Sequence, residues 1–224
     1  MRARLIFERQ LAHLISLALL VGGLCLARGI EGFTTGEFLG LGTDTWVWLN
    51  VANAAAHQIF VWFCWRTELH GGLMTRLFGK AAFLLYAVVF SVLILVRPLL
   101  ITALAYANRG TLPLDRTVAA ILAVACTLPA AYLGYSIKRY FTFRRALGID
   151  HFDRAYRSAP LVRKGIFRWT SNAMYTYGFL LLWAPAVGFR SVAALCVAAF
   201  SHIYISVHYA CTEKPDMNRI YGVG

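Results

Sequence analysis

Long apolar runs separated by short charged connections constrain this chain more than any other feature of its sequence. A membrane-spanning helix needs about 20 consecutive, mainly apolar residues to cross a hydrocarbon core of about 30 Å. Hydrophobic residues make up 59% of the 224 residues and charged residues only 14%, whereas soluble domains carry about 25% charged residues. The sequence therefore predicts an all-α, polytopic integral membrane protein with a single domain, residues 1–224.

Six hydrophobic helices can be placed along the chain. They cover approximately residues 10–28, 46–65, 81–107, 117–138, 172–187 and 191–211. Only Gly188-Phe189-Arg190 separates the last two runs, which predicts a tight antiparallel helical hairpin. The domain then consists of N-terminal helices (1–137), a basic loop (138–171) and a C-terminal catalytic hairpin with its tail (172–224).

Positive charge on every second connection predicts the orientation. The net charge is +12, and the loop from Lys138 to Arg168 holds nine Lys or Arg against Asp150 and Asp153. Cations in short segments between apolar runs follow the positive-inside rule and do not form the continuous basic face of a nucleic-acid-binding protein. We expect both termini and the active site on the cytoplasmic side, with membrane lipids rather than nucleic acid as partners.

Polar residues inside the second span need an explanation, because each costs on the order of 2–3 kcal/mol at the bilayer centre. Asn50, Asn53 and His57 are three and four residues apart and share one helix face. Either they form hydrogen bonds between helices, or His57 lines a substrate cavity. Both interpretations remain open, and His57 is a candidate substrate-binding residue.

A second polar face follows the last span. His202, Ser206, Tyr209 and Glu213 are spaced four, three and four residues apart, which places them on one side of a regular helix. A lone membrane histidine usually packs against a neighbour, but three polar groups in register with an acid favour a site. We interpret His202 and Glu213 as candidate catalytic residues and Tyr209 as a candidate substrate-binding residue.

The basic loop ends at a predicted helix start, Thr170-Ser171-Asn172. These are good N-cap residues, and a helix N-terminus near arginines suits a carboxylate or phosphate. Topology and anionic headgroups alone would also place cations in this loop. Four loop arginines are candidates for contact with a lipid phosphate: Arg144, Arg145, Arg154 and Arg157.

Two short motifs flank the predicted hairpin. The first, G-x-F-R-x-x-x-N-A-x-Y, comprises Gly165, Phe167, Arg168, Asn172, Ala173 and Tyr175. The second, E-K-P-x-M-x-x-x-Y-G, comprises Glu213, Lys214, Pro215, Met217, Tyr221 and Gly222. At these residues the chain resembles the membrane methyltransferases that include phosphatidylethanolamine N-methyltransferases and isoprenylcysteine carboxyl methyltransferases. Ala173 stands where this family usually has proline and Lys214 where it has a second acid, while Asn172 is more like the phospholipid branch.

The resemblance implies S-adenosylmethionine as methyl donor and a lipid as acceptor, most directly the ethanolamine nitrogen of a phospholipid. The candidate cofactor-binding residues are Gly165, Arg168, Asn172, Tyr175, Gly178, His208 and Glu213. Glu213 could equally accept a proton from the acceptor. Three alternatives remain open: another lipophilic acceptor (a prenylcysteine carboxylate or a small molecule), an NADPH-dependent membrane reductase, and a structural protein. No metal site is expected, because the five cysteines are widely spaced; the sequence does not predict the oligomeric state.

Overall fold

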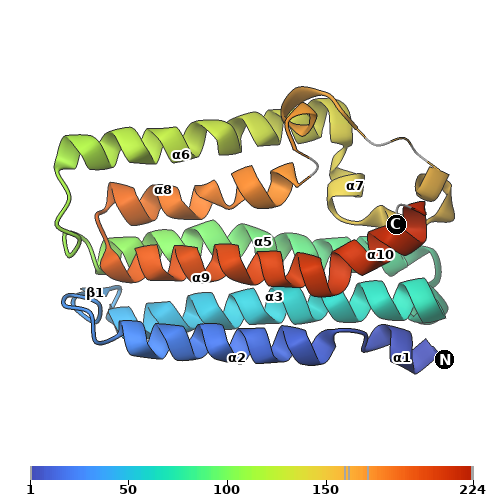
Figure 1. Ribbon diagram of the computed structural model, residues 1–224, viewed down its shortest axis with the longest axis horizontal. Helices are drawn as coiled ribbons and strands as arrows, with labels where there is room; N and C mark the ends of the chain where they lie inside the picture. Colours follow the sequence, from blue (N-terminus) through green and yellow to red (C-terminus); the bar gives the residue numbers. More distant parts are fainter. Residues whose placement is uncertain (1, 159, 161, 171, 223–224) are drawn as a thin grey trace.

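Long helices lie side by side along one axis of the molecule (Figure 1). The computed structural model describes residues 2–158, 160, 162–170 and 172–222. The longer helices are α2 (Gln10–Ala27), α3 (Thr43–Gly71), α5 (Ala82–Ala107), α6 (Arg116–Ser136), α8 (Leu180–Gly188) and α9 (Val192–His208). The shorter elements are α1 (Arg2–Ile6), α4 (Leu73–Phe78), α7 (Phe143–Ala146), α10 (Lys214–Tyr221) and a two-stranded hairpin of β1 (Glu37–Phe38) and β2 (Leu41–Gly42). The all-α prediction is confirmed.

Four helical stretches of the described chain are long and apolar enough to cross a membrane. They are Ala3–Ala27, Leu73–Ala107, Arg116–Phe141 and Val192–Tyr221. The other two predicted spans are also helical. However, α3 carries several buried polar side chains along its 29 residues, and the fifth span is divided into a π-helical turn, η6 (Met174–Gly178), and the nine residues of α8. Length and composition thus support four of the six predicted spans.

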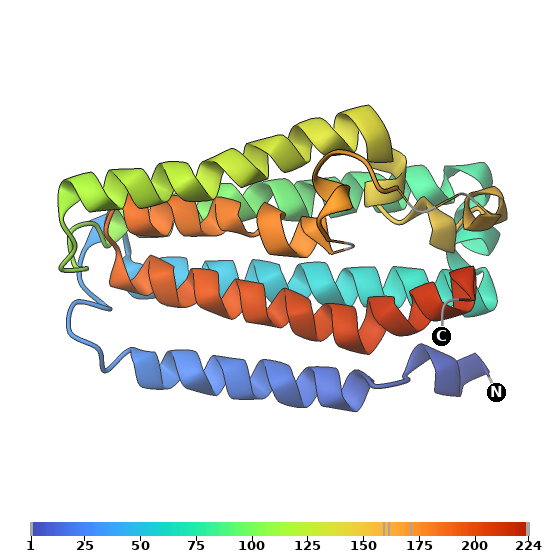
Figure 2. The ribbon, with the colours of Figure 1, turned by 45° about the horizontal axis from the view of Figure 1, so that its top comes forward.

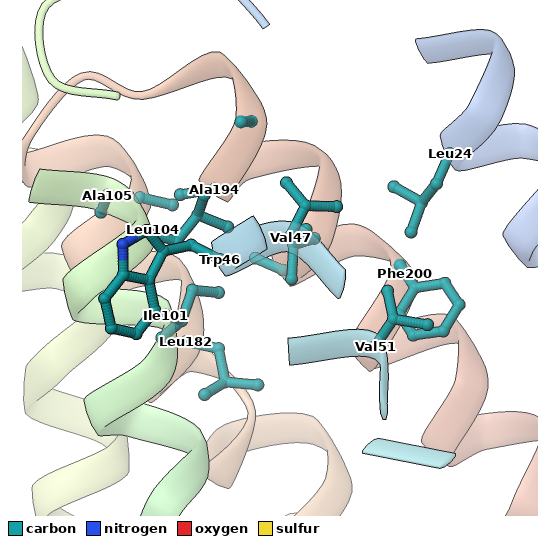
Figure 3. Packing of buried hydrophobic residues seen from close by; sticks show 14 of the residues in the cluster. Leu24, Trp46, Val47, Val51, Ile101, Leu104, Ala105, Leu182, Ala194 and Phe200 are labelled. Atoms are coloured by element: carbon teal, nitrogen blue, oxygen red, sulfur yellow. The ribbon is translucent and has the colours of Figure 1, made fainter. Parts of the chain in front are cut away.

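The main hydrophobic core lies between α2, α3, α5, α8 and α9 (Figure 3). Leu24, Val47, Leu104, Ala194 and Phe200 meet there from four of these helices. Small residues on α9 allow the backbones of neighbouring helices to come close, as in other membrane helix packings. Helix α6 packs mainly on α8, and α2 forms the opposite edge of the bundle (Figure 2).

A buried asparagine forms hydrogen bonds with two of the interhelical connections at one end of the bundle. Asn108 Oδ1 accepts hydrogen bonds from Ser191 Oγ (2.8 Å) and from the Ala193 N–H (3.0 Å) at the α8–α9 turn. Its Nδ2 donates to the carbonyls of Gly32 (2.7 Å) and Thr35 (2.8 Å), which follow α2. The predicted tight hairpin of α8 and α9 is confirmed, and its turn is held to two other connections.

The opposite end of the bundle contains both termini, α7 and α10 (Figure 1). The basic loop and the second motif therefore lie at the same end, while the β-hairpin and the α8–α9 turn lie at the other. This arrangement gathers the basic loop and the second motif at a single end of the bundle.

Candidate active site

Two π-helical turns bring the two motifs together. Turn η6 carries Tyr175, and η7 (Tyr209–Glu213) continues α9 and carries Glu213. The Tyr175 hydroxyl donates a hydrogen bond to the Glu213 carboxylate, and the Tyr175 and Tyr209 rings are 5.7 Å apart. Single π-helical turns inside helices occur frequently at functional sites. Residues from separate motifs thus form one contact at the end of the bundle that carries the basic loop.

The π-helical turn also changes the register of the last span. The Lys214 N–H bonds to the carbonyl of Tyr209, five residues back instead of four, so the predicted continuous face is interrupted. His202 Nδ1 instead accepts a hydrogen bond from Trp183 Nε1 (3.2 Å) on α8. The helical rise from His202 to Glu213 is about 16 Å. The structure therefore does not bring these two candidate catalytic residues together.

A cavity of about 310 Å³ lies beside Tyr175, between α3, α5, α6, α8 and α9. Its lining is mainly apolar. The polar side chains that line it are His57, Gln58, Arg97, Tyr175 and His208, and Gly178 also borders it.

The predicted polar face of α3 has a mixed role. Asn50 donates to the carbonyl of Trp46 in its own helix (2.8 Å), and Asn53 reaches the Leu93 carbonyl of α5 (3.1 Å). His57 lines the cavity and packs edge-on against Phe90, with ring centroids 4.7 Å apart. Asn53 thus forms a hydrogen bond between helices, and His57 borders a cavity, while its role in substrate binding stays a prediction.

Gly165 is required by its contact with α6. Its φ is +60°, and a Cβ at this position would lie 2.6 Å from Ser136 Oγ. The same hydroxyl accepts a hydrogen bond from the Ile166 N–H at 3.1 Å. A side chain at residue 165 would therefore force α6 away from the first motif. The structure thus gives this glycine a role in packing the first motif against α6.

The remaining residues of the first motif lie between Gly165 and η6. Arg168 is exposed and lies over the Trp169 ring at 5.9 Å. The Asn172 N–H donates a hydrogen bond to Thr170 Oγ1 at 3.1 Å. Such local bonds between side chain and backbone are typical of a helix start. Ser171, the other predicted capping residue, lies outside the described residues. Ala173 is fully buried, so the position where the family has proline serves as a packing site here.

A buried ion network supports the turn that carries Glu213. Arg66 on α3 is fully buried and lies 2.8 Å from the equally buried Asp216 carboxylate of α10. Its Nη2 donates to the carbonyls of Cys211 and Thr212, both at 3.2 Å. These carbonyls immediately precede Glu213, so Arg66 stabilises the conformation of the turn that carries it.

His151 of the basic loop extends the same network. Its ring stacks on Trp65 at 4.1 Å and lies 3.4 Å from Asp150 and 3.7 Å from Asp216. Burial lowers the pKa of His151, but the two carboxylates outweigh it and raise this pKa to about 9. Burial raises the pKa of Asp150, but the nearby His151 ring and the hydrogen bond from Tyr221 bring it below its usual value. Tyr221 of the second motif donates to Asp150 at 2.7 Å.

The four loop arginines also lie at this end of the bundle. Arg145 and Arg157 donate to backbone carbonyls of the same loop at 3.2 and 3.0 Å. Arg144 lies over the Phe83 ring at 5.5 Å, and Arg154 is exposed. At least two of the four guanidinium groups therefore help to hold the loop itself.

Sequence reasoning missed Arg66, Arg97, His151 and Asp216. For Arg97 a signal was present, because an arginine inside an apolar span is costly and commonly functional. Arg66 and Asp216 are 150 residues apart, and no local pattern links them. His151 carried no signal beyond its place in the basic loop.

Comparison with known families bears on residues 118–224, which match the model of the phospholipid methyltransferase family. This range contains both motifs, nearly all of α6, the hairpin of α8 and α9, and the contact of Tyr175 with Glu213. No curated protein and no solved structure matched the chain. Residues 118–224 are therefore similar to the phospholipid methyltransferase family, and this match together with the apolar helices supports a membrane methyltransferase.

Proposed function

We propose that the protein transfers a methyl group from S-adenosylmethionine to the ethanolamine nitrogen of a phospholipid. The observation that carries this proposal is the hydrogen bond between Tyr175 and Glu213 beside a largely apolar cavity. It joins the two family motifs at the point where a polar site meets a space suited to a lipid.

The chemistry of the residues at this point fits a sulfonium cofactor. A carboxylate favours a neighbouring cation, and aromatic faces attract one. The sulfonium of the cofactor would be held by Glu213, Tyr175 and Tyr209. Asn172 and Arg168, which precede Tyr175 in the first motif, would bind other parts of the cofactor. When bound, S-adenosylmethionine supplies the methyl group for an in-line displacement.

The residues of the chain would contribute orientation and proton transfer. An ethanolamine ammonium must lose a proton before it can act as nucleophile, and Glu213 would accept that proton or hold the cofactor. The apolar walls would exclude water, and alignment of the two reactants can be worth about 7–11 kcal/mol. His57 and His208 would border the acceptor, while His202 would act only by holding Trp183.

The same proposal includes an orientation. The nine cations of the loop and the termini would face the cytoplasm, as the positive-inside rule predicts. A water-soluble cofactor would then reach Glu213 from the cytoplasmic side, and the loop arginines would attract anionic headgroups at about 1 kcal/mol each.

The test is incorporation of label from S-adenosylmethionine into an added lipid extract by the purified protein. We expect label in methylated derivatives of phosphatidylethanolamine, and Glu213→Gln should lower the initial rate by at least about 100-fold, a loss typical of an acid–base residue. Glu31→Gln, at an exposed acid of the opposite end, is the matched control and should retain the wild-type rate. Near-normal turnover of Glu213→Gln would remove this residue from the mechanism, and label only in other lipids would reject the amine acceptor.

A further inference from the structure

An arginine in the middle of the membrane-spanning part has an incomplete set of partners. Arg97 is 4% exposed, and its Nη2 donates to the Ala54 carbonyl at 3.2 Å. Its Nε and Nη1 are buried and make no hydrogen bond within the described part of the chain, where no acidic group pairs with it either. The helical rise from Arg97 to the end of α5 at Ala107 is about 15 Å, half of a hydrocarbon core of about 30 Å. A charge at this depth requires compensation.

The Phe179 ring provides only part of this compensation. The guanidinium carbon of Arg97 lies 5.6 Å from the centroid of this ring. A cation over an aromatic ring gains attraction, but it leaves the N–H donors without acceptors. Two nitrogen atoms of a buried cation, Nε and Nη1, thus remain available to a ligand.

Other polar groups without partners share the cavity with Arg97. Both ring nitrogens of His57 and Nδ1 of His208 are buried and lack hydrogen-bond partners in the described chain. Buried polar groups without partners are rare in native proteins, and each calls for a specific explanation. The arginine nitrogens can only donate, so they call for acceptor oxygens on a ligand, whereas a neutral His57 ring offers one donor and one acceptor. Together these groups indicate a ligand with a polar, oxygen-bearing head.

The cavity reaches the lipid-facing surface. Leu95, Phe143 and Leu181 line it and are 66%, 60% and 42% exposed. Helix α6, which contributes Leu133 to the cavity, rises away from the neighbouring helices toward its C-terminal end (Figure 2). An apolar chain could therefore leave the cavity directly into the bilayer.

We infer that this cavity binds an amphiphile whose anionic oxygen group, a phosphate or a carboxylate, is held by Arg97 and whose apolar chain extends into the membrane. The inference rests on the proposed function in one respect, that the amphiphile is the methyl acceptor. Phe179, which contacts Arg97, follows Tyr175 by one helical turn, or about 5–6 Å. The anion and the methylated atom are then separated by a short spacer, as the phosphate and nitrogen of an ethanolamine lipid are.

The test measures binding of single-chain probes in neutral detergent without methyl donor. Dodecyl phosphate, dodecanoate and uncharged dodecanol are titrated into the protein, and tryptophan fluorescence follows thermal unfolding. We expect the two anions to raise the unfolding midpoint of the wild type more than dodecanol does. Arg97→Gln should weaken the affinity for the preferred anion by at least about tenfold, since it removes a charge-assisted contact. Arg97→Lys should fall between these two proteins.

The control is Arg109→Gln, which removes an exposed arginine just beyond the C-terminal end of α5. This variant should bind the anions as the wild type does. Unchanged anion affinity in Arg97→Gln would overturn the inference. Equal shifts by dodecanol and the anions in the wild type would overturn it too, without any variant. The stronger of the two anions identifies the group: phosphate points to a phospholipid headgroup and carboxylate to a carboxylic acid acceptor.

The two proposals fail separately. Lipid methylation by the wild type together with unaltered anion binding and kinetics in Arg97→Gln would reject the role of Arg97 and leave the methyltransferase proposal intact. Selective anion binding that Arg97→Gln abolishes, without any methylation, would reject the proposed function and retain the anion site. If both hold, Arg97→Gln should raise KM for the acceptor while S-adenosylhomocysteine affinity, measured by calorimetry, stays the same.

Discussion

Arg66 is a residue whose charge is completely enclosed by protein. Its guanidinium group reaches Asp216 of α10, the carbonyls before Glu213, and the Leu5 carbonyl of α1 at 2.5 Å. Removing one partner of a buried ion pair leaves an uncompensated charge, whereas removing both leaves a largely neutral site. This difference makes the pair accessible to a double-mutant cycle.

We expect Arg66→Met and Asp216→Leu each to lower the free energy of unfolding by about 3 kcal/mol, because each removes the closest counter-charge of a buried group. The longer contacts of Asp216 with His151 and of Arg66 with Glu8 compensate the remaining charge only in part. The double variant should lose less than the sum of the two, with a coupling of about 1–3 kcal/mol. Unfolding in mixed micelles measures all four proteins. Additive losses would show that the two residues stabilise the protein independently of each other.

The charge of His151 makes stability depend on pH. Its pKa is raised from 6.5 to about 9 in the folded protein. Between these values the folded state binds more protons than the unfolded state, so the contribution is complete below about pH 6.5 and disappears as the pH rises through about 9. We expect the midpoint of thermal unfolding to fall across this window. His151→Gln should have a lower midpoint at pH 6.5 and a flatter profile, and an equally steep profile would assign the effect to another group.

At the scale of elements, the two π-helical turns determine where the motifs meet. Turn η6 precedes α8, and η7 lies between α9 and α10. Each widens a helix by one residue where a motif passes through it. Since helical periodicity in a sequence assumes 3.6 residues per turn, the prediction that His202 and Glu213 share a face could not anticipate this shift.

The connections at the opposite end depend on Asn108. Asn108→Ala would leave the Ala193 N–H and the carbonyls of Gly32 and Thr35 without this partner, and each such buried group costs about 1–3 kcal/mol. We expect a loss of stability of about 3 kcal/mol or more, measured as chemical unfolding in detergent. Asn108→Asp keeps one acceptor oxygen but sets a buried carboxylate oxygen against the carbonyls of Gly32 and Thr35, so it should lose at least as much. A loss below about 1 kcal/mol in Asn108→Ala would mean that neighbouring groups replace the amide.

At the scale of the whole molecule, the loop charges predict which end of the helical bundle faces each side of the membrane. Glu31 lies between α2 and β1, and Lys164 lies in the basic loop at the other end. In a variant without the five native free cysteines, Glu31→Cys should react with an impermeant maleimide in intact cells. Lys164→Cys should react only after permeabilisation. The reverse pattern would invert the orientation derived from the loop charges.

The sequence predicted elements better than pairings between them. The third span was placed at residues 81–107 and is α5, Ala82–Ala107, because charge and polar residues bound a long apolar run. The motifs located Tyr175 and Glu213, which do meet. The contact of Arg66 with Asp216 could not be predicted, because it depends on how distant helices pack. Arg97 could have been recognised from the cost of its charge alone.

Helix α3 has 29 residues and is therefore about 43 Å long, about 13 Å more than a hydrocarbon core. Its last turns carry Arg66 and Glu68, both buried against the polar end of the molecule. On the proposed function, α3 thus extends from the level of the apolar cavity to a polar end that projects beyond the hydrocarbon core. A water-soluble cofactor can enter at that end, and a lipid acceptor can enter the cavity from the bilayer. The acceptor therefore never has to leave the membrane for water, so the turnover rate does not depend on how often a lipid escapes from the bilayer.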